Sequence, residues 1–204
     1  YIFHLAPVLW SAILGWLVLC VSGCLVEVTL REWIPAYHPR FPWGGAFFIT
    51  EWHMVWAAVS GMETMIYICL VLLVFYLLRP GKRRYELTGL VVGLCTWVRP
   101  DGITLLGPIF LCLIFDDLPK IGKFKRFLFL TGGFFLFFLP YLLFNLKLAG
   151  SIWPTTFSAK QAEYQATTGL PFLERLWNFF LPFLAGGGVI LLPGAAAALL
   201  YVLR

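Results

Sequence analysis

Two ionisable side chains, Arg99 and Asp101, lie two positions apart inside the long apolar stretch of residues 87–115. In an apolar environment each charge costs about 2.5–3.5 kcal/mol on insertion scales, so another interaction must compensate for it. Either the two side chains neutralise each other and lock a turn, or Arg99 offers its guanidinium to a phosphate while Asp101 orients it or binds a cation. The second interpretation is favoured, because charges in such segments usually serve a function.

Glu63 lies in residues 60–64, directly before another apolar run. Ser60 precedes it by three positions, a spacing that fits a capping box, in which each side chain accepts a hydrogen bond from the backbone N–H group of the other residue. In the functional interpretation Glu63 faces the same cavity as Arg99 and Asp101, and the two roles are compatible. The carboxylates of Glu63 and Asp101 would also supply oxygen ligands to a divalent cation, which stays open as a cofactor; no metal-ligating residue is assigned.

Further polar side chains occur in residues 151–160, where hydroxyl groups, aromatic rings and one cation come together. Thr156 and Lys160 in this segment would suit a sugar or a lipid phosphate, but the composition fits an interfacial loop with a snorkelling lysine equally well. Glu51 and His53 lie within a weaker apolar segment. A lone histidine in such a segment is more often a hydrogen-bonded packing residue than a ligand.

The composition indicates the environment of these side chains. Of the 204 residues, 61% are hydrophobic and 12% are charged, and the net charge is +5. A soluble domain is about 45–50% apolar and about 25% charged, so the chain lacks the polar surface of a cytosolic enzyme, a disordered tail or a secreted disulfide module. The five cysteines lie in apolar stretches without a CxxC pair, which indicates packing residues. We predict an all-α fold, a multi-span bundle of transmembrane helices in the lipid bilayer.

Apolar runs place the predicted spans, because about 20 residues at about 1.5 Å each match a hydrocarbon core of about 30 Å. A polar connection, residues 27–41, follows the first span. Pro182, a glycine run and Pro193 interrupt the last span. The predicted spans are residues 5–26, 42–59, 62–78, 127–146 and 176–203.

Eight of the 15 basic residues lie in two short segments, residues 79–86 and 116–127. This distribution is typical of cytoplasmic loops under the positive-inside rule, and it does not resemble a groove that binds nucleic acid. We therefore predict both basic segments on the cytoplasmic side of the cell membrane. Residues 60–64 and 150–174 are then extracytoplasmic.

Residues 87–115 separate these two basic segments, so a single span there would place one of them outside, against the charge rule. We predict instead a hairpin of two short helices that turns at residues 99–102, where proline and glycine favour a turn. The turn would lie at membrane depth, toward the outer face. Irregular backbone is tolerated there only beside a polar cavity or buried in protein.

Three motifs in this order resemble a known family. Residues 60–64 form a Ser-Gly-Met-Glu-Thr motif that opens a span, residues 89–102 form a glycine- and leucine-rich pattern that ends in Arg-Pro-Asp-Gly, and residues 139–160 end in Thr-Thr-Phe-Ser-Ala-Lys. Over about residues 59–164 the chain resembles the bacterial GT-C fold glycosyltransferases. Within them it is most similar to the branch that includes mycobacterial arabinofuranosyltransferases and many uncharacterised bacterial homologues.

The resemblance implies a membrane enzyme whose donor is a polyprenyl-phosphate-linked sugar. An acceptor hydroxyl on a glycan, lipid or protein attacks the anomeric carbon outside the membrane, an acidic residue acts as general base, and the lipid phosphate leaves. By the same resemblance, Arg99 and Lys160 hold the phosphate, Glu63 and Asp101 shape the pocket or bind the acceptor, and Thr156 belongs to the same substrate-binding group.

In this family the catalytic acid usually lies in the first large outer loop. The chain begins with Tyr1 directly in an apolar helix and ends where the last helix reaches Arg204. We therefore expect residues 1–204 to be a single transmembrane domain, an internal fragment of a longer GT-C-like membrane domain. No catalytic base is assigned, and we expect this chain alone to be inactive.

Other classes of protein stay open as alternatives. A transporter or flippase of lipid-linked glycans also uses broken helices with charges near the membrane midplane, but it should carry them in corresponding positions of two repeats, and residues 99–102 form the single charged break. A polymerase or ligase of lipid-linked glycans shares the carrier lipid. A purely structural assembly subunit would leave Arg99 and Asp101 without a role beyond pairing.

Overall fold

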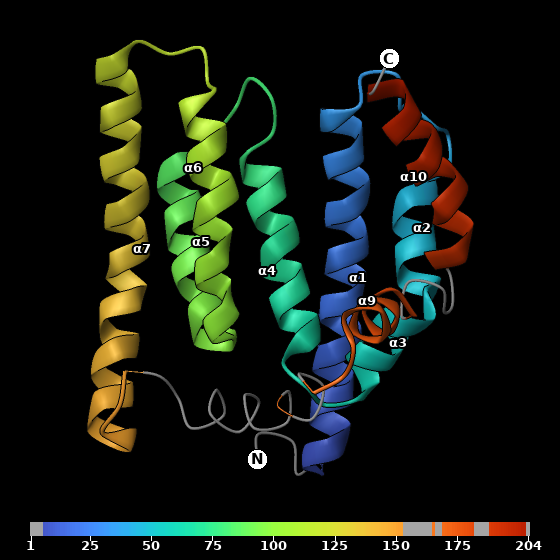
Figure 1. Ribbon diagram of the computed structural model, residues 1–204, viewed down its shortest axis with the longest axis horizontal. Helices are drawn as coiled ribbons and strands as arrows, with labels where there is room; N and C mark the ends of the chain where they lie inside the picture. Colours follow the sequence, from blue (N-terminus) through green and yellow to red (C-terminus); the bar gives the residue numbers. More distant parts are fainter. Residues whose placement is uncertain (1–5, 153–164, 166–168, 182–187, 203–204) are drawn as a thin grey trace. The chain divides into compact units, whose positions relative to one another are not determined.

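The computed structural model describes residues 6–152, 165, 169–181 and 188–202, and every regular element within them is a helix (Figure 1). The predicted all-α fold is confirmed to this extent. The chain divides into two compact units. Unit 1 comprises Tyr1–Thr50 and Met54–Pro154, and unit 2 comprises Glu51–His53 and Thr155–Arg204.

Unit 1 carries the candidate site, and its helices follow one another through short connections. A 3-10 helix, η1, lies between α5 and α6. The elements are α1 (Pro7–Trp33), α2 (Trp43–Thr50), α3 (Trp52–Val59), α4 (Thr64–Leu77), α5 (Tyr85–Val98), η1 (Pro100–Leu105), α6 (Leu106–Ile114) and α7 (Lys120–Ala149). The first residues of α3 are assigned to unit 2.

Two helices among the described residues, α1 and α7, are long and apolar enough to cross a membrane. They have 27 and 30 residues, and at about 1.5 Å per residue each exceeds a hydrocarbon core of about 30 Å. Helices α4 and α5 are apolar but have 14 residues each, so neither spans such a core by itself. Leucine side chains at positions 17, 136 and 143 remain exposed on the two long helices, which favours an apolar environment around them.

Helices α5 and α7 pack closely because glycines line their contact. A Cβ atom at Gly89 would overlap the carbonyl oxygen of Leu130, and a Cβ atom at Gly133 would lie 2.7 Å from the carbonyl oxygen of Glu86. Small residues let helix backbones approach each other in a membrane, where lipid tails remove the hydrophobic drive for association. Val92 is fully buried in the same apolar cluster as Leu130.

The predicted hairpin is present in unit 1. Helix α5 leads away from the first basic segment, η1 makes the turn, and α6 returns, so that the hydroxyl of Tyr85 at the start of α5 donates to Asp116 after α6 at 3.1 Å. The backbone at Arg99 is extended, with φ −146° and ψ 130°, as the following proline requires. Gly102 packs against Cys95, where a Cβ atom would lie 2.7 Å from the carbonyl carbon.

Two predicted boundaries near the start of the chain are wrong. Helix α1 does not end at residue 26 but continues to Trp33, because Arg31 neutralises Glu27 one turn earlier through a contact of 2.8 Å. The predicted span of residues 42–59 is divided into α2 and α3, and Glu51 is the residue between them. Each of the two helices has 8 residues, so neither crosses a membrane by itself.

Unit 2 contains α9 (Phe172–Phe180) and α10 (Gly188–Val202). The predicted interruption at Pro193 is wrong, because α10 continues through this residue. Apolar helices tolerate an internal proline where neighbouring groups satisfy the freed carbonyl. Pro182 and residues 186–187, the other predicted breaks, lie outside the described residues.

Candidate functional site

Ion pairs bring the two basic segments, residues 79–86 and 116–127, to one end of unit 1. Asp116 lies 3.0 Å from Arg83 and 3.6 Å from Arg126. Figure 1 shows the α4–α5 and α6–α7 connections at this end and η1 at the opposite end. We call the first the basic end and the second the hairpin tip. The two basic segments, which the charge distribution predicts on one side, therefore lie at the same end of this unit.

The hairpin tip lies beside the start of α4. The Nε atom of Arg99 lies 3.9 Å from Oε1 of Glu63, and its guanidinium carbon lies 5.7 Å from the centre of the Tyr67 ring. The side chains of Arg99 and Glu63 are 24% and 47% exposed. An ion pair this long and this exposed contributes only about 0–1 kcal/mol, so the guanidinium keeps its capacity to bind a ligand. We call Glu63, Tyr67, Arg99 and Asp101 the hairpin-tip site.

Backbone hydrogen bonds fix the position of Arg99. Its N–H group donates to the carbonyl of Cys95 at 2.8 Å, and its carbonyl accepts from the N–H group of Gly102 at 2.9 Å. The indole N–H of Trp97 donates to the carbonyl of Phe137 in α7 at 2.8 Å. Hydrogen bonds to residues before and after Arg99 therefore fix its backbone, while its side chain extends from the turn toward Glu63.

The first interpretation of Arg99 and Asp101, a turn locked by mutual neutralisation, is not supported. Among the described residues the acidic partner of Arg99 is Glu63, and no ion pair joins Arg99 to Asp101. Asp101 is exposed, and its backbone carbonyl accepts a hydrogen bond from the hydroxyl of Thr104 at 2.7 Å. The apolar sequence around Asp101 suggests a buried carboxylate, but this residue is exposed in the structure.

The predicted capping box between Ser60 and Glu63 is wrong. The hydroxyl of Ser60 donates to the carbonyl of Ala57 at 3.0 Å and accepts from the N–H group of Met62 at 3.3 Å. No side-chain cap forms at the start of α4. Gly61 adopts a positive φ of 71°, so the chain reverses after Ser60, which completes the preceding helix instead of opening the next one.

Two predicted site residues, Thr156 and Lys160, lie outside the described residues, so the structure does not place them. The sequence leaves Glu63 and Asp101 open as ligands of a divalent cation. Within the residues that the structure describes, no group of three or more His, Cys, Asp or Glu side chains is gathered closely enough to hold a metal ion.

Glu51 and His53 form a local pair, so His53 is hydrogen-bonded as predicted, but its side chain is 41% exposed and is not a packing residue of the core. The Nδ1 atom of His53 lies 2.9 Å from Oε1 of Glu51, and the backbone N–H group of His53 donates to Oε2 at 2.8 Å. A side-chain oxygen that accepts from the first turn of a helix satisfies a donor with no partner inside the helix. The pair therefore stabilises the start of α3.

Sequence reasoning missed a buried carboxylate in α1. Glu27 is 7% exposed and accepts hydrogen bonds from Nε of Arg31 at 2.8 Å, from the hydroxyl of Tyr37 at 3.1 Å and from the N–H group of Gly45 at 3.4 Å. The sequence does carry one signal of this carboxylate. Arg31 lies four positions after Glu27, so the two side chains lie on the same helix face and can form an ion pair.

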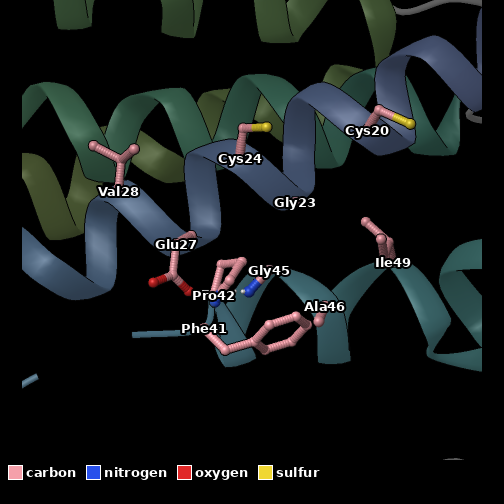
Figure 2. A pocket seen from close by; sticks show the side chains of 10 residues that line it. All are labelled: Cys20, Gly23, Cys24, Glu27, Val28, Phe41, Pro42, Gly45, Ala46 and Ile49. Atoms are coloured by element: carbon pink, nitrogen blue, oxygen red, sulfur yellow. Dashed lines mark hydrogen bonds between the residues drawn. The ribbon is translucent and has the colours of Figure 1, made fainter. Parts of the chain in front are cut away.

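An apolar cavity of about 450 Å³ lies between α1 and α2 beside Glu27. Figure 2 shows Glu27 near Pro42 and Gly45 at one end of this cavity and Cys20 and Ile49 at the other end. The oxygens of Glu27 are already engaged by three donors, so this carboxylate holds α1 against the α1–α2 connection and is not offered to a ligand.

The base of the hairpin is held more tightly than its tip. The carboxylate of Asp116 is 18% exposed and contacts Arg83, Arg126 and the hydroxyl of fully buried Tyr85. Burial alone would lower the pKa of Arg83, but its hydrogen bond with Tyr85 and the negative charge of Asp116 raise this pKa overall. Arg83 therefore stays charged and fixes the two ends of the hairpin to each other.

Comparison of the chain with protein-family models, with curated proteins and with solved structures finds no match in any of the three.

Proposed function

We propose that this chain belongs to a membrane-embedded glycosyltransferase of the GT-C type, which transfers a sugar from a polyprenyl-phosphate donor to an extracytoplasmic acceptor. The observation that carries the proposal is the position of Arg99. Its guanidinium lies at the tip of an apolar hairpin, 3.9 Å from an exposed carboxylate. A cation with so weak a protein partner suits the phosphate of a lipid carrier.

In this proposal unit 1 lies in the cell membrane, and α1 and α7 cross it. The basic end faces the cytoplasm under the positive-inside rule, and the hairpin tip faces the opposite side. The separation of the basic segments from Arg99 within unit 1 supports this orientation. The short helices α4, α5 and α6 would then form the interior of a multi-span bundle, where the irregular backbone at η1 would be buried in protein or would line a polar cavity.

The proposed chemistry is displacement at the anomeric carbon of the donor sugar. The acceptor oxygen forms a bond to this carbon, the bond to the phosphate oxygen breaks, and the acceptor proton passes to a general base. Negative charge develops on the departing phosphate. Arg99 stabilises this charge, because a cation that is already in place needs no reorganisation when the charge develops.

The remaining residues of the hairpin-tip site have supporting roles in the proposal. Glu63 keeps the guanidinium of Arg99 oriented through a weak ion pair that a phosphate can replace. The ring of Tyr67 lies against the guanidinium and adds a cation–π contact. Exposed Asp101 is available to hydroxyl groups of the sugar or the acceptor. Lys160 and Thr156 remain proposed contributors on the strength of the sequence motif.

Binding of a polyprenyl monophosphate to the purified full-length protein in detergent, measured by native mass spectrometry, tests the proposal. Arg99→Gln should weaken binding by roughly 10- to 100-fold, the value of one charge-assisted hydrogen-bonded contact. Arg84→Gln is the matched control, because Arg84 is exposed on the connection before α5 and should bind as the unaltered protein does. Equal binding by both variants would contradict the proposal.

A second arm separates the enzyme from a transporter of lipid-linked glycans. The full-length protein is incubated with a polyprenyl-phosphate sugar and a membrane acceptor, and cleavage of the donor is followed. Release of polyprenyl phosphate that depends on Arg99 supports sugar transfer. Donor binding without any cleavage, together with movement of intact donor across proteoliposomes, supports transport instead.

A further inference from the structure

Two adjoining cavities at the basic end have no part in the proposed transfer reaction. The smaller cavity, about 310 Å³, is lined by charged groups that include Lys82, Arg83 and Asp116. The larger cavity, about 520 Å³, is mainly apolar. Leu118 and Arg126 line both cavities, so the two are neighbours. Their volumes fall in the range of ligand pockets, about 300–1,000 Å³.

The cations around these cavities differ in how firmly the protein holds them. Arg83 is engaged, because it lies 3.0 Å from Asp116 and donates to the carbonyl of Cys112 at 3.4 Å. Arg126 lies 3.6 Å from Asp116, its guanidinium carbon lies 5.5 Å from the centre of the Tyr85 ring, and its side chain is 37% exposed, so it is held less firmly than Arg83.

Two lysines complete the set of loosely held cations. Lys82 and Lys125 are exposed and form no ion pair among the described residues. The ammonium of Lys125 lies 5.8 Å from the ring centre of Phe129, which lines the larger cavity. Arg126, Lys82 and Lys125 can therefore turn toward an anion.

We propose that the two cavities form one binding site for an anionic phospholipid. The headgroup phosphate would lie in the smaller cavity, among Lys82 and Arg126, and the first part of an acyl chain would lie in the larger cavity beside Phe129. Basic pockets between helices on the cytoplasmic side of membranes bind anionic headgroups in this way. The inference requires that unit 1 lies in a bilayer, and it does not depend on sugar transfer.

The position of Asp116 gives the site a second testable property. Its carboxylate competes with the lipid phosphate for Arg126 and for Arg83. Replacing it with asparagine removes the negative charge while keeping a side chain of similar size. The affinity for an anionic lipid should then rise, although the hairpin base loses its ion pairs. A purely structural role of the basic cluster predicts no such gain.

The test compares two double variants of the full-length protein in detergent by native mass spectrometry. Lys82→Gln with Lys125→Gln removes one cation from each basic segment at the cavities. Arg84→Gln with Lys120→Gln removes from each segment one exposed cation that lines neither cavity. Both pairs weaken the positive-inside signal equally. The probes are phosphatidylglycerol, phosphatidylcholine with the same acyl chains, and inorganic phosphate.

Phosphatidylglycerol should bind at least tenfold more tightly than phosphatidylcholine. The Lys82/Lys125 variant should lose roughly 10- to 30-fold in affinity, as expected for two cations beside a membrane surface, and the Arg84/Lys120 variant should change by less than about threefold. Asp116→Asn should bind phosphatidylglycerol more tightly than the unaltered protein. Equal loss in the two double variants would overturn the proposal. So would equal affinity for the two lipids, or displacement of phosphatidylglycerol by equimolar inorganic phosphate.

Discussion

The two ends of the α5–α6 hairpin use the same side-chain chemistry in different ways. At the base, Asp116 lies 3.0 Å from Arg83 and accepts a hydrogen bond from buried Tyr85. At the tip, Arg99 lies 3.9 Å from Glu63, whose side chain is 47% exposed. The ion pairs at the base therefore hold the hairpin together, whereas at the tip the ion pair of Arg99 with Glu63 is long and exposed.

This difference shows that residue type alone does not separate a structural ion pair from a ligand site. Both ends contain an arginine and a carboxylate next to an apolar helix. What distinguishes them is the number of partners that converge on the carboxylate and the access of solvent to it. The comparison predicts that substitutions at the tip change polyprenyl-phosphate binding and turnover, while substitution of Asp116 or Tyr85 at the base changes stability.

The largest expected effect is on turnover at the tip. Arg99→Gln should reduce the rate of sugar transfer by the full-length protein by about 10²–10³-fold, the usual result of removing one donor from a site that stabilises a developing anion. Arg99→Lys should restore part of the rate, because the charge remains while the planar fork is lost. An assay with a radiolabelled donor measures the rate of sugar transfer by both variants. An unchanged rate in Arg99→Gln would contradict the role of Arg99 in stabilising the departing phosphate.

The next effect in size is on stability at the base. Asp116→Asn should lower the free energy of unfolding by about 1–3 kcal/mol, less than the 3–5 kcal/mol of a fully buried pair because the carboxylate is partly exposed. Thermal unfolding in detergent measures the change. A variant as stable as the unaltered protein would show that the base is not the tighter end.

A smaller loss of stability is expected when the phenol hydroxyl at the base is removed. Tyr85→Phe keeps the buried ring but deletes the 3.1 Å hydrogen bond to Asp116, so the free energy of unfolding should fall by about 0.5–1.5 kcal/mol. Tyr37→Phe, which removes a hydroxyl donor to Glu27, serves as a second probe of the same kind. An unchanged free energy of unfolding in Tyr85→Phe would show that the hydroxyl of Tyr85 does not stabilise the base.

The smallest effect on stability is expected at the tip. Glu63→Gln should leave the free energy of unfolding within about 1 kcal/mol of the unaltered value, because the pair is long and exposed. Binding of polyprenyl phosphate should become roughly two- to fivefold tighter, since the carboxylate no longer competes for Arg99. If Glu63→Gln destabilised the protein as much as Asp116→Asn does, the ion pairs at the two ends would contribute equally to stability, against the prediction.

The hairpin could be predicted from the sequence because two independent signals agree on it. The basic segments on either side of residues 87–115 must lie at the same end, and Pro100 and Gly102 favour a turn between them. The helical content follows from the length of the apolar runs, which exceeds that of an ordinary strand. Such signals are local or depend on charge counts, so they can be recognised without knowledge of how helices pack.

The partner of Arg99 could not be predicted in the same way. Asp101 is close in sequence, but Glu63 is close in space because α4 packs beside α5. The failed capping box has a local cause, the positive φ of Gly61, which assigns Ser60 to the end of one helix. Glu27 lies outside the predicted first span because a carboxylate usually ends an apolar run. Two of its three donors, Tyr37 and Gly45, belong to the chain beyond α1 and could not be paired with it from the sequence.

The most direct test of the central claim is a cryo-electron microscopy structure of the full-length protein in nanodiscs with a polyprenyl phosphate bound. We predict that the phosphate lies within about 2.7–3.0 Å of the guanidinium of Arg99, the distance of a charge-assisted hydrogen bond. Glu63 should then have moved away from Arg99 or share it with the phosphate. A phosphate bound at the basic end, with Arg99 still paired to Glu63 alone, would contradict the account.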